Sequence, residues 1–192
     1  MKNEALRADQ VRRTYQLERS LGKADTTDTY DQYEYLVGAV PSKLMLNFKN
    51  GAILTFDMEF MATDHETRDG ATGPKTGTRE SLVEADAFNS TGDVVRLALT
   101  PVSQTDSHPT PYFAYLTDFE LSIDNSLSQN KAVGVLGAIE STEGLFTVDM
   151  SASVYFTKVS SIAAVRANDS ASLDLTLAKA NAGITIDLPL VT

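Results

Sequence analysis

The residues with the clearest potential for chemistry are candidate metal ligands in the middle of the chain. Asp64, His65 and Glu66 are three consecutive donors. Asp106 and His108 supply two further donors of the kinds that bind transition metals. The chain contains only two histidines, and both lie in a stretch without clear periodicity. A polar loop explains these residues more simply, so we predict no metal site.

Carboxylates two positions apart form the second group. Asp57 with Glu59, and Asp118 with Glu120, could suggest acid–base hydrolysis, which needs one carboxyl whose pKa is raised by a partly apolar pocket. The open face of a sheet does not provide such a pocket. The glycine pattern GVLGAIESTEG lacks the strand, glycine and helix order that phosphate binding requires, and no GxSxG or GKS/T motif occurs. We therefore predict no enzyme, no catalytic residue and no cofactor.

The paired carboxylates belong to runs that alternate apolar with polar residues, which is typical of half-buried β-strands. In 52–61, Asp57 and Glu59 share one side, and the expected core side holds Leu54, Phe56, Met58 and Phe60. In 116–124, Asp118, Glu120 and Asp124 point outward, and Phe119, Leu121 and Ile123 are expected in the core.

The same split recurs towards the end of the chain. In 145–156, Asp149 faces outward, opposite the expected core residues Phe146, Val148, Met150, Ala152, Val154 and Phe156. Two closing strands, 172–177 and 184–188, place Asp174 and Asp187 outward. Every outward charge on these runs is negative. Two interpretations stay open: the ordinary solvated face of an acidic protein, or a surface that repels polyanions.

The remaining elements follow from local patterns. We predict strands at 14–20, 30–40 and 94–99, a short helix at 159–168 and a helical turn within 81–88. Gly38 and Pro41 are expected to end the second strand. The runs 43–48 and 52–61, joined through Lys49-Asn50-Gly51, predict a β-hairpin. The polar segment 62–112 has little periodicity and is predicted to be a long loop or arm.

Composition limits the classes of function. A chain of 192 residues with 42% hydrophobic residues predicts a single domain over 1–192. A formal net charge of −10 argues against a surface that grips nucleic acid. The absence of cysteine excludes disulfides and thiolate metal sites. No signal-peptide core or apolar run of about 20 residues is visible, so we predict no membrane insertion.

The order of these elements resembles that of the tail tube proteins of long-tailed, non-contractile bacteriophages. The resemblance spans 13–192 and rests on TYQLERS, YLVGAVPSKLMLNF, GAILTFDMEFMA, AFNSTGDV, LTDFELSIDNSLSQNKAVGVLGA, GLFTVDMSASVYF and IDLPLV. Family members usually carry a longer region before the first of these motifs, which predicts that this chain is a shortened form.

The resemblance implies a mainly β fold, a β-sandwich of two antiparallel sheets with one short flanking helix. It implies hexameric rings whose inner sheets join into a barrel and which stack into a conduit for DNA. The chain would assemble in the host cytoplasm into the virion tail. Its partners would be further copies of itself, the tape measure, terminator and baseplate proteins, and DNA in transient, non-specific passage.

The resemblance also assigns roles to residues. An acidic lining suits a conduit, because like-charge repulsion keeps contact with DNA weak. The candidates for a lumen or solvent face are Asp57, Glu59, Asp118, Glu120, Asp124, Asp149, Asp174 and Asp187. Lys49, Asn50 and Gly51 would form an inter-subunit hairpin, and 62–112 would hold an arm that neighbouring subunits order.

Two alternatives remain. A tail terminator, a baseplate hub or a secretion-system tube would use much the same fold. A monomeric β-sandwich that binds a carbohydrate or another ligand would need exposed aromatic residues on one sheet. The chain has no Trp, and most Phe residues fall on predicted core faces, which disfavours the second alternative.

Overall fold

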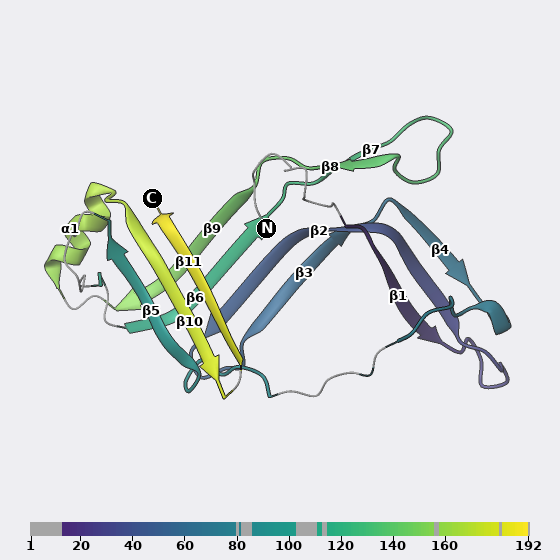
Figure 1. The fold of residues 1–192 in the computed structure, drawn as a ribbon, viewed down its shortest axis with the longest axis horizontal. Helices are drawn as coiled ribbons and strands as arrows, with labels where there is room; N and C mark the ends of the chain where they lie inside the picture. The colour runs from purple at the N-terminus through teal and green to yellow at the C-terminus, as the bar shows by residue number, and fades with distance from the viewer. Residues whose placement is uncertain are drawn as a thin grey trace. The chain divides into compact units, whose positions relative to one another are not determined.

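A computed structural model describes residues 13–79, 81, 86–102, 111–112, 115–155, 158–180 and 182–191 (Figure 1). The elements in chain order are β1 Tyr15–Gly22, β2 Gln32–Lys49, β3 Thr55–Met61, β4 Asp64–Arg68, the 3-10 helix η1 Gly70–Thr72, β5 Val94–Pro101, β6 Tyr115–Asp124, β7 Ser128–Asn130, β8 Glu140–Thr142, β9 Thr147–Tyr155, α1 Val159–Ala167, β10 Ala171–Lys179 and β11 Ala182–Val191.

The described strands form three sheets. In the six-stranded sheet the order is β1-β2-β6-β9, and β3 and β4 also pair with β2. A three-stranded sheet has the order β11-β10-β5, and β7 pairs with β8. The pairs β1–β2, β2–β4, β5–β10, β10–β11 and β7–β8 are antiparallel. The prediction of a mainly β sandwich with antiparallel sheets is confirmed, and the described sheets remain open rather than closing into a barrel.

The chain divides into two compact units. The first comprises 1–45, 57–83 and 122–148, and the second comprises 46–56, 84–121 and 149–192. The prediction of a single domain over 1–192 therefore stays a prediction.

The second unit contains the three-stranded sheet and much of the buried core. Along β10 the residues Ala171, Leu173, Leu175 and Leu177 are buried, while the residues between them are less covered. Each fully buried leucine contributes about 1.5–3 kcal/mol to folding. Strands β5, β10 and β11 confirm the predictions at 94–99, 172–177 and 184–188.

Two main-chain bonds fix the register of β2 against β6. The N–H of Asn50 donates to the carbonyl of Thr117 at 3.0 Å, and the N–H of Asn125 donates to the carbonyl of Ser42 at 2.9 Å. The two bonds are eight residues apart along each strand, from 42 to 50 and from 117 to 125, so the antiparallel register is the same at both bonds.

This register places Phe48 opposite Phe119, and their rings meet edge to face with centroids 5.3 Å apart. Phe119 and Leu121 are buried, which confirms their predicted place in the core. Ile123 is half-buried. The alternate positions of β6, beginning with Asp118 and Glu120, therefore face away from this core.

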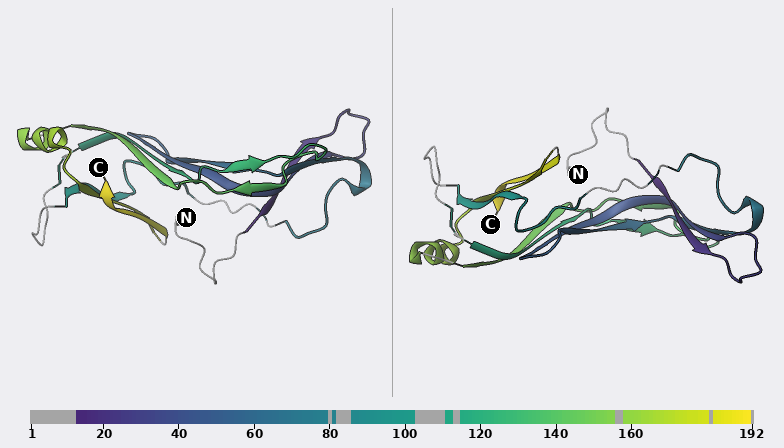
Figure 2. Two further views of the ribbon diagram at one scale, coloured as in Figure 1. Left: turned by 90° about the horizontal axis from the view of Figure 1, so that it is seen from above. Right: turned by 90° about the horizontal axis from the view of Figure 1, so that it is seen from below.

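Helix α1 spans nine residues, Val159–Ala167, in agreement with the prediction at 159–168 (Figure 2). Asn168 has a φ of +55°, and the N–H of Asp169 donates to the carbonyl of Ala164 at 3.2 Å. A left-handed residue followed by this bond is a common way to end a helix, because it satisfies a terminal carbonyl.

The predicted break in the second strand is wrong. Strand β2 continues through Gly38 and Pro41 for 18 residues. Gly38 has a φ of +65° at an irregularity in the β1–β2 register, so glycine absorbs a bulge here. Pro41 lacks an N–H, but its carbonyl accepts a bond from the Asn125 side chain at 3.0 Å.

The segment 62–112 contains more structure than its composition suggested. It includes β4, which was not predicted, together with η1 and the predicted β5. Strand β4 pairs with β2, with Val37 opposite Asp64 and Tyr33 opposite Arg68. Of the predicted helical turn within 81–88, residues 82–85 lie outside the described residues, and residues 81 and 86–88 are not helical.

Strand β3 departs from its predicted faces. It begins at Thr55 rather than Ala52, and its expected core residues Phe56 and Met58 are 66% and 46% exposed. Strand β9 also differs from its predicted faces, because its expected core residues Val148 and Ala152 are exposed. Phe156 lies outside the described residues. Alternation correctly predicted strands here, but the described residues leave these apolar side chains exposed.

Candidate functional site

The eight acidic positions are divided between the two larger sheets. Asp174 and Asp187 lie on β10 and β11 of the three-stranded sheet, directly opposite each other. The other six lie on β3, β6 and β9 of the six-stranded sheet: Asp57, Glu59, Asp118, Glu120, Asp124 and Asp149. One sheet therefore carries most of the predicted acidic surface.

Most of these carboxylates are exposed, and two are partly covered for identifiable reasons. Asp124 Oδ1 accepts a bond from the N–H of Ser126 at 2.6 Å, so it supports the turn after β6. Asp174 forms an ion pair with Arg96 of β5. Asp57, Glu59, Asp118, Glu120, Asp149 and Asp187 are exposed.

Two lysines of β2 lie opposite acidic residues of β6. The β2–β6 register places Lys49 opposite Asp118 and Lys43 opposite Asp124. Glu120 has the neutral Asn47 opposite it. Glu120 is therefore the acidic residue of β6 that has no lysine opposite it on β2, a distinction that the alternation of single strands could not provide.

An aromatic contact shows where the side of β3 that was expected to join the core lies. The rings of Tyr15 and Phe60 meet edge to face at 6.2 Å, and Tyr15 stands opposite Ala39 in the β1–β2 register. Ala39 is completely buried. Met58 lies on the same side of β3 as Phe60, because two residues separate them along a strand.

The predicted hairpin between β2 and β3 is present, and Asn50 and Gly51 form its turn. The N–H of Ala52 donates to the carbonyl of Lys49 at 3.2 Å, and Gly51 has a φ of +70°. The same Lys49 carbonyl accepts a bond from the Ser90 hydroxyl at 2.7 Å. The turn is thus attached to a second segment, and its role between subunits stays a prediction.

The candidate metal ligands are separated by strand geometry. Asp64, His65 and Glu66 are consecutive in β4, so the histidine points to the opposite face from the two carboxylates. His65 Nε2 lies 3.3 Å from a carboxylate oxygen of Glu34. No metal-binding cluster occurs in the described residues. Asp106 and His108 lie outside them.

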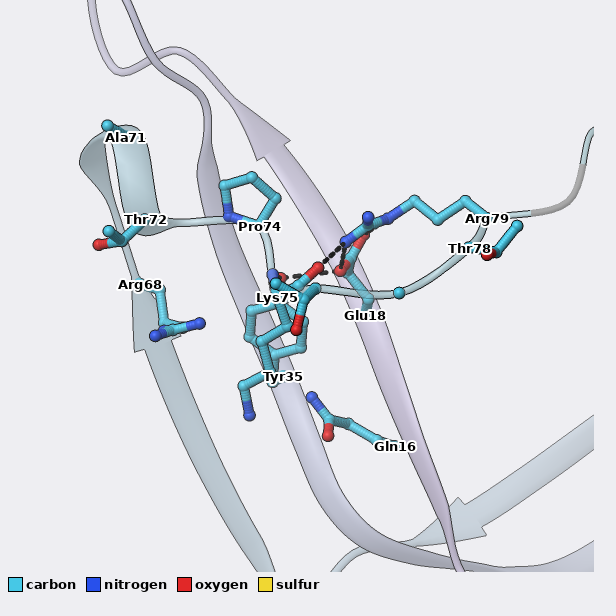
Figure 3. Close-up of a pocket in the computed structure, with 12 residues that line it drawn as sticks. Gln16, Glu18, Tyr35, Arg68, Ala71, Thr72, Pro74, Lys75, Thr78 and Arg79 are labelled. Atoms are coloured by element: carbon cyan, nitrogen blue, oxygen red, sulfur yellow. Dashed lines mark hydrogen bonds and ion pairs between the residues drawn. The ribbon is translucent and has the colours of Figure 1, made fainter.

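Sequence reasoning missed a polar cluster in which 73–79 covers β1 and β2 (Figure 3). The hydroxyl of Tyr35 donates to Glu18 Oε2 at 2.7 Å and accepts a bond from the N–H of Lys75 at 2.9 Å. Arg79 Nε donates to Glu18 Oε1 at 2.6 Å. These groups line an open hollow of about 750 Å³.

The charges in this cluster satisfy one another. The bond from Arg79, followed by that from Tyr35, holds the pKa of Glu18 below its usual value. Lys75 Nζ lies 2.5 Å from Glu66 Oε2 and, as the largest cause, lowers the pKa of Glu66. Because both cations are already paired, this cluster can fasten a segment more readily than it can bind a charged ligand.

Sequence reasoning also missed an apolar hairpin end. The loop between β7 and β8 exposes Val133 and Leu136 almost completely, at 105% and 93%, and Val135 at 50%. The run AVGVLGA was visible in the sequence as a turn-rich apolar segment. Its apolar residues on a two-stranded hairpin were the signal that could have identified a contact surface.

Among the described residues, no helix has the length and apolarity needed to cross a membrane. A search of curated proteins finds no match to this chain. A family model described as phage tail tube protein matches residues 4–191, nearly the whole chain. The chain therefore belongs to the phage tail tube protein family, and it is a structural component of a virion tail.

Proposed function

We propose that this chain forms hexameric rings, that the rings stack into the tail tube, and that the six-stranded sheet lines the conduit through which DNA passes. The observation that carries the proposal is that this one sheet holds six of the eight acidic positions. Like-charge repulsion would keep DNA from adhering to such a wall.

The sheet also has edges suited to ring closure. Strand β9 ends the β1-β2-β6-β9 order, and β3 pairs with β2 alone among the described strands. Neither β3 nor β9 contains proline or glycine. By contrast, the edge strand β11 contains Pro189, a residue that discourages further pairing. Pairing of β3 with β9 of the next subunit would join the sheets into a barrel.

The proposal includes assembly in the host cytoplasm with tape measure, terminator and baseplate proteins as partners. Electron microscopy of the concentrated protein, together with its mass from light scattering, tests ring formation. Sixfold rings or hollow tubes are expected. A protein that stays monomeric at every concentration would count against the ring.

The lining is tested separately with assembled tubes. Neutralising Glu120, Asp118 and Asp149 together should leave assembly intact and strengthen retention of double-stranded DNA at low salt. Asp187→Asn is the matched control, because it removes an exposed carboxylate from the other sheet. If both sets of tubes retain DNA as the unmodified tubes do, the six-stranded sheet does not line the conduit.

A further inference from the structure

The tip of the β7–β8 hairpin, defined as Val133, Val135 and Leu136, presents apolar side chains that the described part of the chain leaves uncovered. Val133 and Leu136 are almost fully exposed. Single exposed apolar residues are ordinary on protein surfaces, but three within four positions at the end of a hairpin form a patch.

The base of the hairpin is held firmly, so the tip has a defined direction. The N–H of Ala138 donates to the carbonyl of Thr63 at 2.8 Å, and the side-chain amide of Gln129 donates to the carbonyl of Ala62. Gly137 passes so close to the Thr63 carbonyl that a Cβ there would lie 2.5 Å from that oxygen. A tip that is already positioned loses less conformational entropy on binding.

A second uncovered apolar surface lies in the same unit. We call it the β3 face and define it as Tyr15, Met58 and Phe60. Tyr15 is 47% exposed and Met58 is 46% exposed, and the Tyr15 ring contacts the Phe60 ring. The flexible thioether of Met58, on the same side of β3 as Phe60, can adapt to a small aliphatic insertion.

The identity of the partner follows from the family and the charge. A tail tube protein assembles with copies of itself, and a heterologous contact uses two different patches on each copy. Copies that each carry a formal net charge of −10 repel one another, so apolar surfaces must supply the attraction. The tip supplies one of the two apolar patches that such a contact needs, and the β3 face supplies the other.

We propose that the tip of the β7–β8 hairpin docks against the β3 face of a second copy of this chain. The contact is heterologous, with Leu136 of one copy against Met58 of the next. It rests on the proposed function, because it assumes that copies assemble, but it specifies a contact that ring formation alone does not require.

The absence of cysteine from the chain permits a direct test. Leu136→Cys and Met58→Cys are prepared with tags of different mass, mixed and mildly oxidised. The mixed disulfide should form at least fivefold more abundantly than the disulfide of either variant with itself. The control pairs Leu136→Cys with Val159→Cys, since Val159 is an apolar residue outside the β3 face and, at 82% exposed against 46% for Met58, is the more accessible of the two.

The outcomes separate this contact from the ring. Rings in electron micrographs without the mixed disulfide would overturn the docking and leave the ring standing. The mixed disulfide without rings would support the docking and count against the ring. Equal yields from the Met58 and Val159 pairs would also overturn it.

A second variant distinguishes loss of the contact from loss of the fold. Leu136→Asp should keep the circular dichroism spectrum and melting temperature of the parent, because the parent side chain is almost fully exposed. Val133→Cys, at the same tip, should also form a preferential disulfide with Met58→Cys, and it should lose that preference in a Leu136→Asp background. Retention of that disulfide would contradict the docking.

Discussion

The guanidinium of Arg79 clasps the carboxylate of Glu18, which lies 61 positions earlier in the chain. Arg79 Nε is 2.6 Å from Glu18 Oε1, and Nη2 contacts Oε2. The Tyr35 hydroxyl donates to the same Oε2. One carboxylate therefore joins β1, β2 and the segment 73–79. Protonation of this carboxylate in acid should release that segment.

Lowering the pH should free 73–79 from β1. The pKa of Glu18 in the folded protein lies below the value of 4.5 for an unperturbed glutamate, chiefly because of the Arg79 bond. A depressed carboxyl pKa contributes stability that is present above the unfolded pKa and is lost as the pH falls through the folded one. Carbon-detected NMR of the Glu18 carboxyl should show a midpoint below 4.5.

Glu18→Gln serves as the control for this titration. It should remove the acid-dependent change in hydrogen exchange at the Lys75 amide, which donates to Tyr35. A Glu18 midpoint at or above 4.5, or an unchanged Lys75 response in the glutamine variant, would show that the Arg79 contact does not control this segment.

Tyr35→Phe should destabilise the fold by about 1–2 kcal/mol, because it removes a buried hydroxyl and leaves the Lys75 N–H without its acceptor. Urea unfolding measures this loss. Tyr33→Phe is the matched control, since the Tyr33 ring stacks on Tyr35 at 6.3 Å and is half-buried. Equal losses from both variants would mean that the hydroxyl network adds nothing.

The success of sequence prediction depended on which surfaces the chain itself covers. In β10 the apolar set Leu173, Leu175 and Leu177 was predictable, because the leucines form one buried side of a strand paired on both edges. In β3 the same alternation failed. A pattern shows that Phe56 and Met58 share a face, but it does not show whether that face is covered by this chain or by another.

The missed features have equally physical reasons. Strand β4, with the sequence DHETR, contains no large apolar residue, and it forms because the long β2 offers it a partner. The Glu18–Arg79 pair joins residues that no local pattern relates. Family resemblance predicted the class of protein, whereas these contacts required the structure.

Arg96→Ala should destabilise the three-stranded sheet, because two carboxylates in it then repel each other without a neutralising cation. Asp174 and Asp187 stand directly opposite each other, and Arg96 pairs with Asp174. Like charges opposite each other are destabilising, so loss of the partly exposed cation should cost up to about 1 kcal/mol. Urea unfolding should show a larger loss at low salt than at high salt. Adding Asp187→Asn should restore much of the stability that Arg96→Ala loses. Strictly additive effects of the two substitutions on stability would contradict this coupling.

Gly137→Ala should loosen the β7–β8 hairpin far more than Gly134→Ala does. Both glycines have positive φ, +94° and +87°, so an alanine at either position carries a similar backbone cost of about 1–2 kcal/mol. A Cβ at Gly134 meets no atom within 4 Å, whereas one at Gly137 lies 2.5 Å from the Thr63 carbonyl oxygen. That oxygen accepts the Ala138 N–H bond at 2.8 Å. Hydrogen exchange at Ala138 should therefore accelerate at least tenfold more in the Gly137 variant. Similar rates in the two variants would mean that the contact with Thr63 does not hold the hairpin in place.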